Sequence, residues 1–281
     1  MAHPHHLDVE KSPAVRPVAR VTGAARRIGR VIALELAQAG FDIALHHRGT
    51  APKSFAEATS TAEELRAAGA RVEVFPADFA DPAAATALLP AVAEVFGRVD
   101  AVINSASRFE YDSPATFDAA LLESLMRINT AAPVALAQGL ATQAAAQPAH
   151  PSVTPCVVNL LDQKLHNPNP DYFSYTLTKA ALAHATVLLA QALAPAVRVC
   201  GVSPGITLVS GPMDEQEFAK AHKLTALGRS STTADIARAV RFLLESPAIT
   251  GIDLAVDGGQ HLVSQSRDVL FLARDAQSAS N

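Results

Sequence analysis

The sequence predicts an α/β fold: one domain with a doubly wound parallel sheet of about seven strands. Short apolar runs alternate with helical stretches from residue 18 to residue 256, a pattern typical of parallel sheets covered by helices. A glycine-containing turn, residues 22–29 (TGAARRIG), joins the first apolar run to the first helical stretch. Polar or glycine residues follow several predicted strands, at the carboxyl ends where such sheets bind ligands.

Composition limits the class of protein. Of 281 residues, 49% are hydrophobic and 18% are charged, which suits one large globular domain. The net charge is -4 without a basic stripe, so nucleic acid is not an expected partner. Polar residues interrupt the alanine-rich apolar runs, so no membrane partner is expected either. Cys156 and Cys200 lie in apolar runs, which suggests reduced, buried thiols and a cytoplasmic location.

The chain divides into three parts. Residues 1–16 contain prolines and few large apolar residues, and we expect a flexible arm there. Residues 17–263 form the domain, and residues 264–281 are expected to be a C-terminal tail. Three histidines in the arm could bind a metal, but no other ligands accompany them, so we expect a loose arm and no metal site.

The glycine turn has the geometry that binds phosphate. It follows a predicted strand at residues 18–21 and precedes a helix that extends to Ala39. Gly23 would let backbone N–H groups and the positive helix N-terminus approach a pyrophosphate. Gly29 would let the helix pack closely on the strand, whereas Arg27 replaces the middle glycine of the usual G-x-G-x-x-G pattern. An ordinary β–α turn is the alternative interpretation.

The end of the second predicted strand, residues 41–45, indicates which dinucleotide would bind. At this place an acid would bond the ribose hydroxyl of NAD, whereas an arginine would accept the extra phosphate of NADP. The chain has His47, Arg48 and Gly49 here and no acid, with Arg26 in the glycine turn nearby. Since the arginine fork suits phosphate, we predict NADP(H). The alternative is that Arg48 is only a surface charge.

The middle of the chain supplies further residues of this kind. Asp78, which precedes Phe79, could accept a hydrogen bond from an adenine or could cap the next helix. Asn104, Ser105 and Ala106 are small enough to pass close beneath a cofactor ring. The elements expected around them are helices at residues 54–68 and 82–96 and strands at residues 72–75 and 99–103.

The second half is expected to begin with a long helix at residues 117–146. Asn129 and Pro133 are unfavourable inside a helix, so we predict a kink there. The loop at residues 208–227 is polar and long, as lids and substrate loops are. The remaining elements are strands at residues 156–161, 197–202 and 252–256 and a helix at residues 233–244.

Tyr175 and Lys179 lie four residues apart, on one face of a predicted helix. An ammonium beside a phenol would lower the pKa of the phenol, as an acid or base catalyst requires. Alone, the pair could be an ordinary solvated helix face. The carboxyl ends of the strands place Gly23, Arg48 and Asp162 at the same edge, and this convergence favours a site.

In these motifs the chain resembles the short-chain dehydrogenase/reductase family over residues 17–263. The resemblance is carried by the glycine turn, Asn104–Ser107 (NSAS), the Tyr175/Lys179 pair and a closing VDGG. It implies a Rossmann-type fold, a nicotinamide cofactor and an oligomer, for which we expect a homotetramer. The cofactor-binding residues that it implies are Gly23, Arg26, Ile28, His47, Arg48, Gly49, Asp78, Phe79, Asn104, Ser105, Ala106, Tyr175, Lys179, Pro204, Gly205 and Thr207.

Asp162 is a departure from the family pattern. Most members carry a serine thirteen residues before the tyrosine, whereas the pteridine reductases carry an aspartate there, as this chain does. The chain is also similar to that subfamily in its N-x-A-S-x-F segment, residues 104–109. The resemblance implies that Phe109 stacks on a pterin ring and that Ser107 bonds the pterin and the cofactor phosphate region.

The activity implied is NADPH-dependent reduction of a pterin C=N bond. The catalytic residues would be Asp162, Tyr175, Lys179 and Asn129, and the substrate would contact Ser107, Phe109, Asp162 and Tyr175. In this interpretation Tyr175 delivers the proton with help from Asp162, Lys179 bonds the nicotinamide ribose, and Asn129 holds a water chain and the helix kink. The alternatives are a general carbonyl reductase of the same family and a non-catalytic NADP(H)-binding protein.

Overall fold

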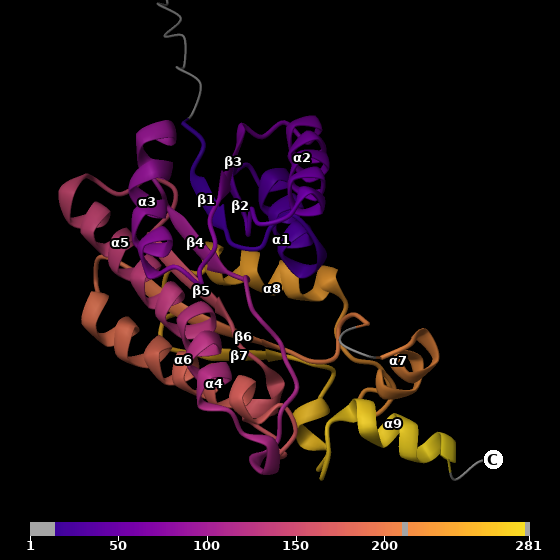
Figure 1. Ribbon diagram of the computed structural model, residues 1–281. Helices are drawn as coiled ribbons and strands as arrows, with labels where there is room; N and C mark the ends of the chain where they lie inside the picture. Colours follow the sequence, from indigo (N-terminus) through magenta and orange to yellow (C-terminus); the bar gives the residue numbers. More distant parts are fainter. Residues whose placement is uncertain (1–14, 210–212, 279–281) are drawn as a thin grey trace, which may run out of the picture.

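A single parallel sheet forms the centre of the molecule. The computed structural model describes residues 15–209 and 213–278, and within these ranges the strands follow the order β3-β2-β1-β4-β5-β6-β7 (Figure 1). All adjacent pairs are parallel, and the order reverses between β1 and β4. The bounds are β1 (Val18–Val21), β2 (Asp42–His47), β3 (Val72–Pro76), β4 (Ala101–Asn104), β5 (Cys156–Leu160), β6 (Arg198–Pro204) and β7 (Asp253–Val256).

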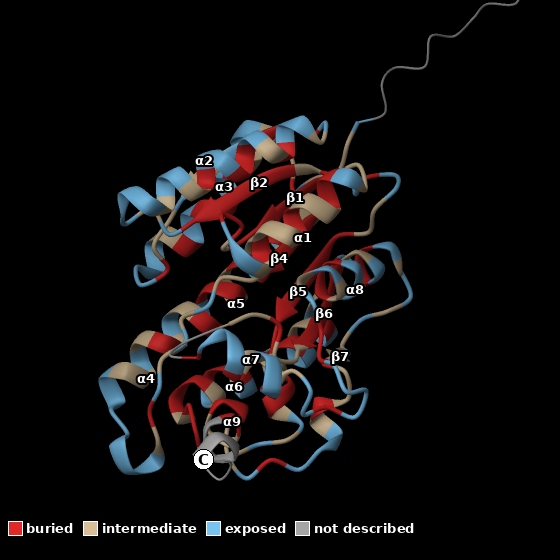
Figure 2. Cartoon of the chain, turned by 90° about the vertical axis from the view of Figure 1, so that its right-hand side faces the viewer, coloured by how far each residue is buried: buried red, intermediate tan, exposed pale blue. Residues whose placement is uncertain are grey.

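Helices cover both faces of the sheet and enclose two apolar cores. One face is covered by α1 (Arg27–Gln38), α2 (Pro52–Ala67) and α8 (Thr233–Glu245), the other by α3 (Pro82–Phe96), α5 (Ala132–Ala146) and α6 (Phe173–Leu193). The five inner strands are almost wholly buried between these layers, whereas the edge strands β3 and β7 are partly exposed (Figure 2). The predicted Rossmann-type fold is therefore confirmed. Short 3₁₀ turns lie at η1 (Pro114–Thr116), η3 (Gln163–Leu165) and η4 (Gln260–Leu262).

The long helix expected at residues 117–146 is interrupted as predicted. It divides into α4 (Ala119–Met126), a π-helical turn η2 (Arg127–Ala131) and α5. Asn129 lies buried in the wide turn, and Pro133 follows in the first turn of α5, where its missing N–H is tolerated. The interruption brings a polar side chain to the interior of the protein.

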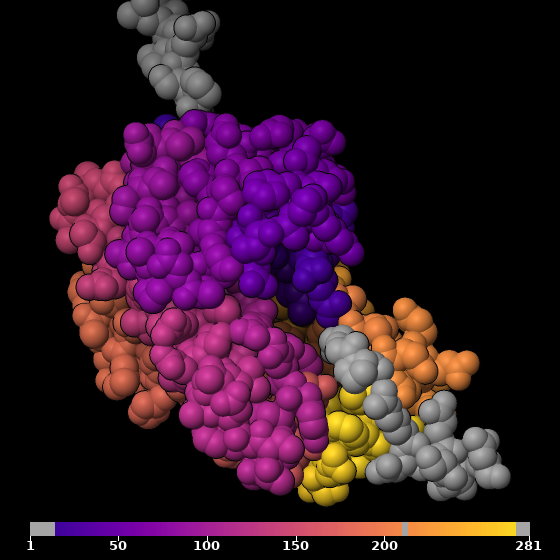
Figure 3. All heavy atoms as spheres, viewed as in Figure 1, coloured from indigo at the N-terminus to yellow at the C-terminus, as the bar shows by residue number. Residues whose placement is uncertain are grey.

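Two helices lie where the sequence suggested a loop and a tail. The first is α7 (Glu215–Ala221), inside residues 208–227, and the second is α9 (Val269–Ser278), inside the expected C-terminal tail. They pack together through a small third core that includes Met213, Ala221 and Leu270. In the space-filling view the α7 and α9 regions lie together at one corner (Figure 3). The expectation of a tail is therefore corrected for the described part of that segment.

The expected N-terminal arm lies mostly outside the described residues. Its last residue, Arg16, forms an ion pair with Asp42 at 3.0 Å and donates to the carbonyl oxygen of Phe41. Among the helices described, none has the length and apolar character needed to cross a membrane.

Candidate active site

The glycine turn after β1 is held tightly against β4. Gly23 adopts a left-handed φ of 64°, and a Cβ there would lie 3.1 Å from Cα of Ala106. A Cβ on Gly29 would lie 2.4 Å from the carbonyl oxygen of Gly23. Thr22 Oγ1 accepts hydrogen bonds from the N–H groups of Ser105 and Ala106, both at 2.8 Å. Only glycine fits at these close approaches, as a phosphate-binding turn requires.

His46 joins the glycine turn to the end of β3, a role that the sequence did not reveal. The Gly23 N–H donates to Nδ1 of His46 at 3.1 Å, so the ring proton is on Nε2, which donates to the carbonyl oxygen of Ala77 at 2.9 Å. The ring stacks on Phe79, with centroids 4.4 Å apart. Burial, and to a lesser degree nearby Arg20, lowers the pKa of His46 to about 3. The imidazole is therefore neutral and in one tautomer.

The end of β2 contains Arg48, a cation suited to a phosphate. Arg48 is exposed, and its Nε donates to Asp78 Oδ2 at 3.1 Å. His47 Nδ1 pairs with Ser54 Oγ at 2.8 Å, whereas its buried Nε2 has no hydrogen-bond partner among the described residues. A Cβ on Gly49 would lie 2.7 Å from Cβ of Pro76. The exposed Arg48 guanidinium fits the extra phosphate of NADP(H).

The other predicted cofactor-binding residues near the glycine turn and the end of β3 have separate surroundings. Asp81, not Asp78, caps α3 by accepting from the Ala83 N–H, so the capping alternative for Asp78 is wrong. Arg26, the residue before α1, is largely exposed and lies 3.9 Å from Glu57. Ile28 lies in the first turn of α1, half-buried.

Arg27, at the position of the missing glycine, points elsewhere. Its φ of 55° is left-handed, a conformation that glycine adopts without strain. Its guanidinium donates to the carbonyl oxygen of Val209 at 2.9 Å, on the segment that follows β6. The glycine turn is thereby tied to the loop beyond β6.

The carboxyl ends of β4 and β6 frame the next part of the site. Asn104 Nδ2 donates to Asn159 Oδ1 at 2.8 Å, while its buried Oδ1 has no partner among the described residues. Beyond Pro204, the Gly205 N–H donates to the carbonyl oxygen of Val256 at 3.1 Å. Thr207 Oγ1 donates to the Gly205 carbonyl oxygen at 2.8 Å. The unsatisfied amide oxygen and the fixed backbone bend are features that a cofactor ring could use.

An acid from another loop positions the N-terminus of α6, which carries Tyr175. Ser174 donates its N–H to Asp112 Oδ1 at 2.9 Å and its hydroxyl to Oδ2 at 2.5 Å. The Phe173 N–H donates to the Asp112 carbonyl oxygen. Because Tyr172, the residue before the helix, makes no capping bond of its own, Asp112 supplies the cap. The first turn of α6 is therefore fixed to the segment after β4.

Tyr175 and Asp162 form a hydrogen-bonded pair. The phenol donates to Asp162 Oδ2 at 2.9 Å, and Asp162 Oδ1 accepts from the Lys164 N–H at 2.9 Å. Burial raises the pKa of Asp162, although Lys164, Tyr175 and Lys179 act to lower it. Burial and the neighbouring carboxylate raise the pKa of Tyr175 well above its ordinary value. The expectation that Lys179 lowers this pKa is therefore wrong in the structure, because a carboxylate stands closer.

Lys179 lies below the phenol rather than against its oxygen. Its Nζ donates to the carbonyl oxygen of Leu160 at 2.7 Å and lies 5.8 Å from the ring centroid of Tyr175. Burial lowers the pKa of this ammonium to about 8, although Asp162 acts to raise it. With one acceptor among the residues that the structure describes, this buried cation retains N–H donors for another ligand.

The pKa of Lys179 predicts how the stability of the ligand-free protein depends on pH. Between about pH 8 and 10.5 the unfolded chain still holds the Lys179 proton while the folded chain has released it. The free energy of unfolding should therefore rise with pH, by up to about 1.4 kcal/mol per pH unit relative to Lys179→Met. Urea unfolding of both proteins over this range checks it, with exposed Lys53→Met as the control. A flat difference for Lys179→Met would contradict the assignment.

Asn129 acts through other residues. Its Oδ1 accepts from the Arg108 N–H at 2.9 Å and from Ser107 Oγ at 3.2 Å. Its Nδ2 donates to the Arg108 carbonyl oxygen and to Thr178 Oγ1, both at 3.0 Å. Both ends of the amide are thus bonded to protein, and they connect the segment after β4 to α6. The interpretation as a holder of the helix interruption fits this geometry, and the expected water chain stays a prediction.

An aromatic surface lies beside the Tyr175 hydroxyl. Phe109 is 39% exposed and stacks on Tyr172, with ring centroids 4.1 Å apart and planes 18° apart. It also meets Tyr175 edge-on at 4.7 Å. A flat ring placed here would contact aromatic carbon and reach the Tyr175–Asp162 pair.

The glycine turn, Arg48 at the end of β2 and the Tyr175/Lys179 pair all lie at the carboxyl edge of one parallel sheet. This combination defines a nicotinamide-dependent oxidoreductase. The chain belongs to the short-chain dehydrogenase/reductase family. Residues 23–261 match the family model described as enoyl-(acyl carrier protein) reductase.

Three relatives illustrate the range of activities within this similarity. The solved structure of FolM alternative dihydrofolate reductase 1 from Brucella canis, complexed with NADP, is 34% identical with a TM-score of 0.81, covering 91% of this chain and 98% of that one. Pteridine reductase 1 of Leishmania tarentolae is 32% identical, covering 88% of this chain and 96% of its own. The 3-oxoacyl-[acyl-carrier-protein] reductase FabG of Staphylococcus aureus is 30% identical, covering 87% and 98%.

Proposed function

We propose that this oxidoreductase reduces a C=N bond of a pterin, with NADPH as the reductant. The observation that carries the proposal is the hydrogen bond between Tyr175 and Asp162, beside the aromatic surface of Phe109. A pterin is flat and rich in N–H groups, which suits an aromatic face next to a carboxylate. The resemblance of Asp162 to the aspartate of pteridine reductases agrees with this chemistry.

The cofactor is NADP(H). The glycine turn cannot accept a Cβ without displacing its own backbone, and Arg48 with His47 Nε2 suits a phosphate. Asn104 Oδ1 and the remaining N–H groups of Lys179 can serve the nicotinamide end. When bound, NADPH supplies a hydride to the carbon of the C=N bond.

The protein's part of the reaction is to deliver a proton. Burial and the neighbouring Asp162 raise the pKa of Tyr175 well above its ordinary value, so the phenol keeps its proton at neutral pH. The phenol donates it to the substrate nitrogen, directly or through a water, and Asp162 supports the hydroxyl during this step. Lys179 adds positive charge below the ring, which stabilises the phenolate as it forms. Asn129 positions Ser107 and Arg108 through hydrogen bonds to its side-chain oxygen.

The comparisons support this proposal and also define its rival. Pteridine reductase 1 and the FolM structure favour a pterin or dihydrofolate substrate. The similarity to a 3-oxoacyl reductase favours a carbonyl substrate in its place. Asp162 separates the two, because a negative charge suits the N–H groups of a pterin better than a carbonyl oxygen. We also propose a homotetramer in the cytoplasm, as the family resemblance implies.

Turnover tests the proposal directly. NADPH oxidation by the purified protein should be rapid with dihydrobiopterin, dihydromonapterin or dihydrofolate and slow with a 3-oxoacyl thioester, and NADH should be the poorer reductant. Tight NADPH binding without pterin turnover would reject the proposal and favour the carbonyl substrate.

Asp162 variants test the role of the carboxylate. Asp162→Asn and Asp162→Ser should each lower kcat/KM for the pterin by about 100-fold, since the acceptor that holds the phenol proton loses its charge. The affinity for NADPH should change little, and the pKa of Tyr175 should fall, as ultraviolet absorbance of the phenolate would show. Unchanged pterin turnover in Asp162→Ser would leave Asp162 with a purely structural role.

A further inference from the structure

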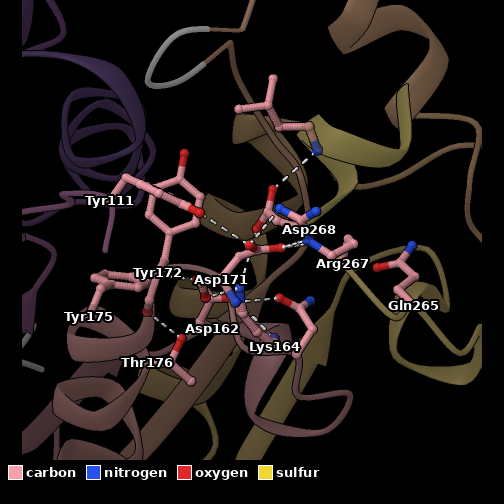
Figure 4. A network of polar contacts seen from close by, with 12 residues as sticks. Tyr111, Asp162, Lys164, Asp171, Tyr172, Tyr175, Thr176, Gln265, Arg267 and Asp268 are labelled. Atoms are coloured by element: carbon pink, nitrogen blue, oxygen red, sulfur yellow. Dashed lines mark hydrogen bonds and ion pairs between the residues drawn. The ribbon is translucent and has the colours of Figure 1, made fainter. Parts of the chain in front are cut away.

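Four charged side chains from two distant segments meet beside the candidate active site. Lys164 and Asp171 lie in the loop after β5, whereas Arg267 and Asp268 precede α9 (Figure 4). We name these four residues the Asp171 cluster. Arg267 holds the carboxylate with two hydrogen bonds, from Nε to Oδ2 at 2.8 Å and from Nη2 to Oδ1 at 2.9 Å. The C-terminal segment is thereby joined to the loop that leads into α6.

The cluster is closed by further hydrogen bonds. The Asp268 N–H donates to Asp171 Oδ2 at 2.8 Å. Lys164 Nζ donates to the Asp171 carbonyl oxygen at 2.6 Å and lies 3.4 Å from Asp268 Oδ2. Burial acts to raise the pKa of Asp171, but Arg267 and the Asp268 N–H outweigh it and lower this pKa. The carboxylate is therefore ionised and fully engaged at neutral pH.

Two of the four charges are buried, whereas the Arg267 side chain is 42% exposed and Asp268 is partly exposed. Asp171 is 3% exposed and Lys164 is 4% exposed. A buried charge is costly unless it is paired and hydrogen-bonded, so removal of one partner leaves the others unfavourably placed. Loss of the Arg267 fork would free the Asp171 carboxylate to seek water, and the loop would move with it.

The Asp171 cluster contacts the aromatic residues around Phe109 through Tyr172 and Tyr111. Tyr172, the residue after Asp171, has a left-handed φ of 52°, which is strained for a bulky side chain. Its ring stacks on Phe109 and meets Tyr111 edge-on at 5.2 Å, and Lys164 Nζ lies 5.5 Å from its centroid. The Tyr111 hydroxyl donates to Asp171 Oδ1 at 3.5 Å. Such a backbone conformation persists only when its surroundings hold it.

The C-terminal segment reaches the same surface and the α7 region. Phe271 on α9 packs on Tyr111 at 5.5 Å. Gln265 donates to the carbonyl oxygen of Leu224 at 3.4 Å, and Leu270 is buried in the core shared with α7. Residues 265–273 therefore contact the aromatic surface through Tyr111 and also contact the α7 region.

We propose that residues 265–273 form part of the substrate site, with Arg267 as a positioning residue that holds Asp171 and thereby Tyr172 and Phe109 in place for a flat ring. This inference rests on the proposed function for the identity of that ring. Arg267 acts on substrate affinity through the aromatic surface, without a part in cofactor binding.

The test compares Arg267→Ala with Arg267→Lys, which keeps the charge but not the two-pronged bond, and with Arg241→Ala on α8 as the matched control. Arg241 also forms ion pairs, with Glu35 on α1 and with Glu245 on α8. Neither helix carries a residue of the Asp171 cluster. Steady-state kinetics with NADPH and dihydrobiopterin, NADPH binding and amide hydrogen exchange are measured for each protein.

Arg267→Ala should raise KM for the pterin about tenfold, with kcat within about threefold and the NADPH affinity unchanged. Exchange should accelerate about tenfold in residues 165–175 only. Arg267→Lys should fall between, and Arg241→Ala should match the wild type.

Two results would overturn the inference: unchanged exchange at residues 165–175 in Arg267→Ala, or a loss of protection across the whole sheet together with weaker NADPH binding. A wild-type protein that turns over no pterin rejects the proposed function instead. The exchange measurement, which needs no substrate, then still decides whether Arg267 holds this loop.

Discussion

Replacement of Tyr175 by phenylalanine should lower kcat for the pterin by about 10²- to 10⁴-fold, the range that a lost general acid produces. The change removes the hydroxyl that donates to Asp162 at 2.9 Å and leaves the ring and its contact with Phe109 in place. Steady-state kinetics measures the loss. Fluorescence titration should show that the NADPH affinity changes by less than about threefold, because in the ligand-free protein the lost hydroxyl bonds Asp162 and the ring itself is kept.

Tyr111→Phe provides the control for the loss of a phenol near the substrate. Its hydroxyl donates to Asp171 at 3.5 Å, away from the proton-donating pair, so kcat should stay near the wild-type value. Loss of NADPH binding in Tyr175→Phe, with chemistry intact in single turnover, would show that the proton-donor role is misassigned.

Substitution of Gly29 by alanine should impair cofactor binding most strongly. The new Cβ would lie 2.4 Å from the carbonyl oxygen and 2.9 Å from the carbonyl carbon of Gly23, so the turn itself must move. We expect the dissociation constant of NADPH to rise about 10- to 100-fold, equivalent to roughly 1–3 kcal/mol of strain. Isothermal titration calorimetry of the purified variant measures the change.

Gly139→Ala is the matched control. Gly139 lies within α5, and the nearest atoms to its added Cβ would belong to the side chain of Leu89, at 3.2 Å, and not to the backbone. Its NADPH affinity should equal that of the wild type. If Gly29→Ala bound NADPH normally, the turn after β1 would not be the phosphate site.

The parts of the fold that could be predicted are determined by residues close to each other in the sequence. The predicted helix at residues 82–96 matches α3 in both bounds, because Pro82 opens it and Gly97, with a φ of 81°, ends it. The interruption at Asn129 was similarly visible as a polar residue close before a proline. The candidate site could be assembled because parallel strands bring their carboxyl ends to one edge.

The features that could not be predicted from the sequence depend on contacts between residues far apart along the chain. The high pKa of Tyr175 comes first from burial and then from a carboxylate thirteen residues away, whereas spacing along a helix suggested only Lys179. His46 joins two loops through ring nitrogens whose partners no local pattern reveals. Among the described side chains of α9, the buried apolar ones are Val269, Leu270 and Ala273, and the attachment of this segment through Arg267 to Asp171 spans 96 residues of sequence.

The Tyr175–Asp162 bond has a consequence for which ligands can bind well. The phenol has one proton, and in the ligand-free protein the carboxylate already accepts it. A ligand that offers only an acceptor must compete with Asp162 for that proton and would leave a half-buried carboxylate poorly solvated. A ligand with an acceptor nitrogen next to an N–H donor can instead exchange partners with both side chains, so that no hydrogen bond is lost. Selectivity at this site is thus a matter of hydrogen-bond exchange, and shape alone does not determine it.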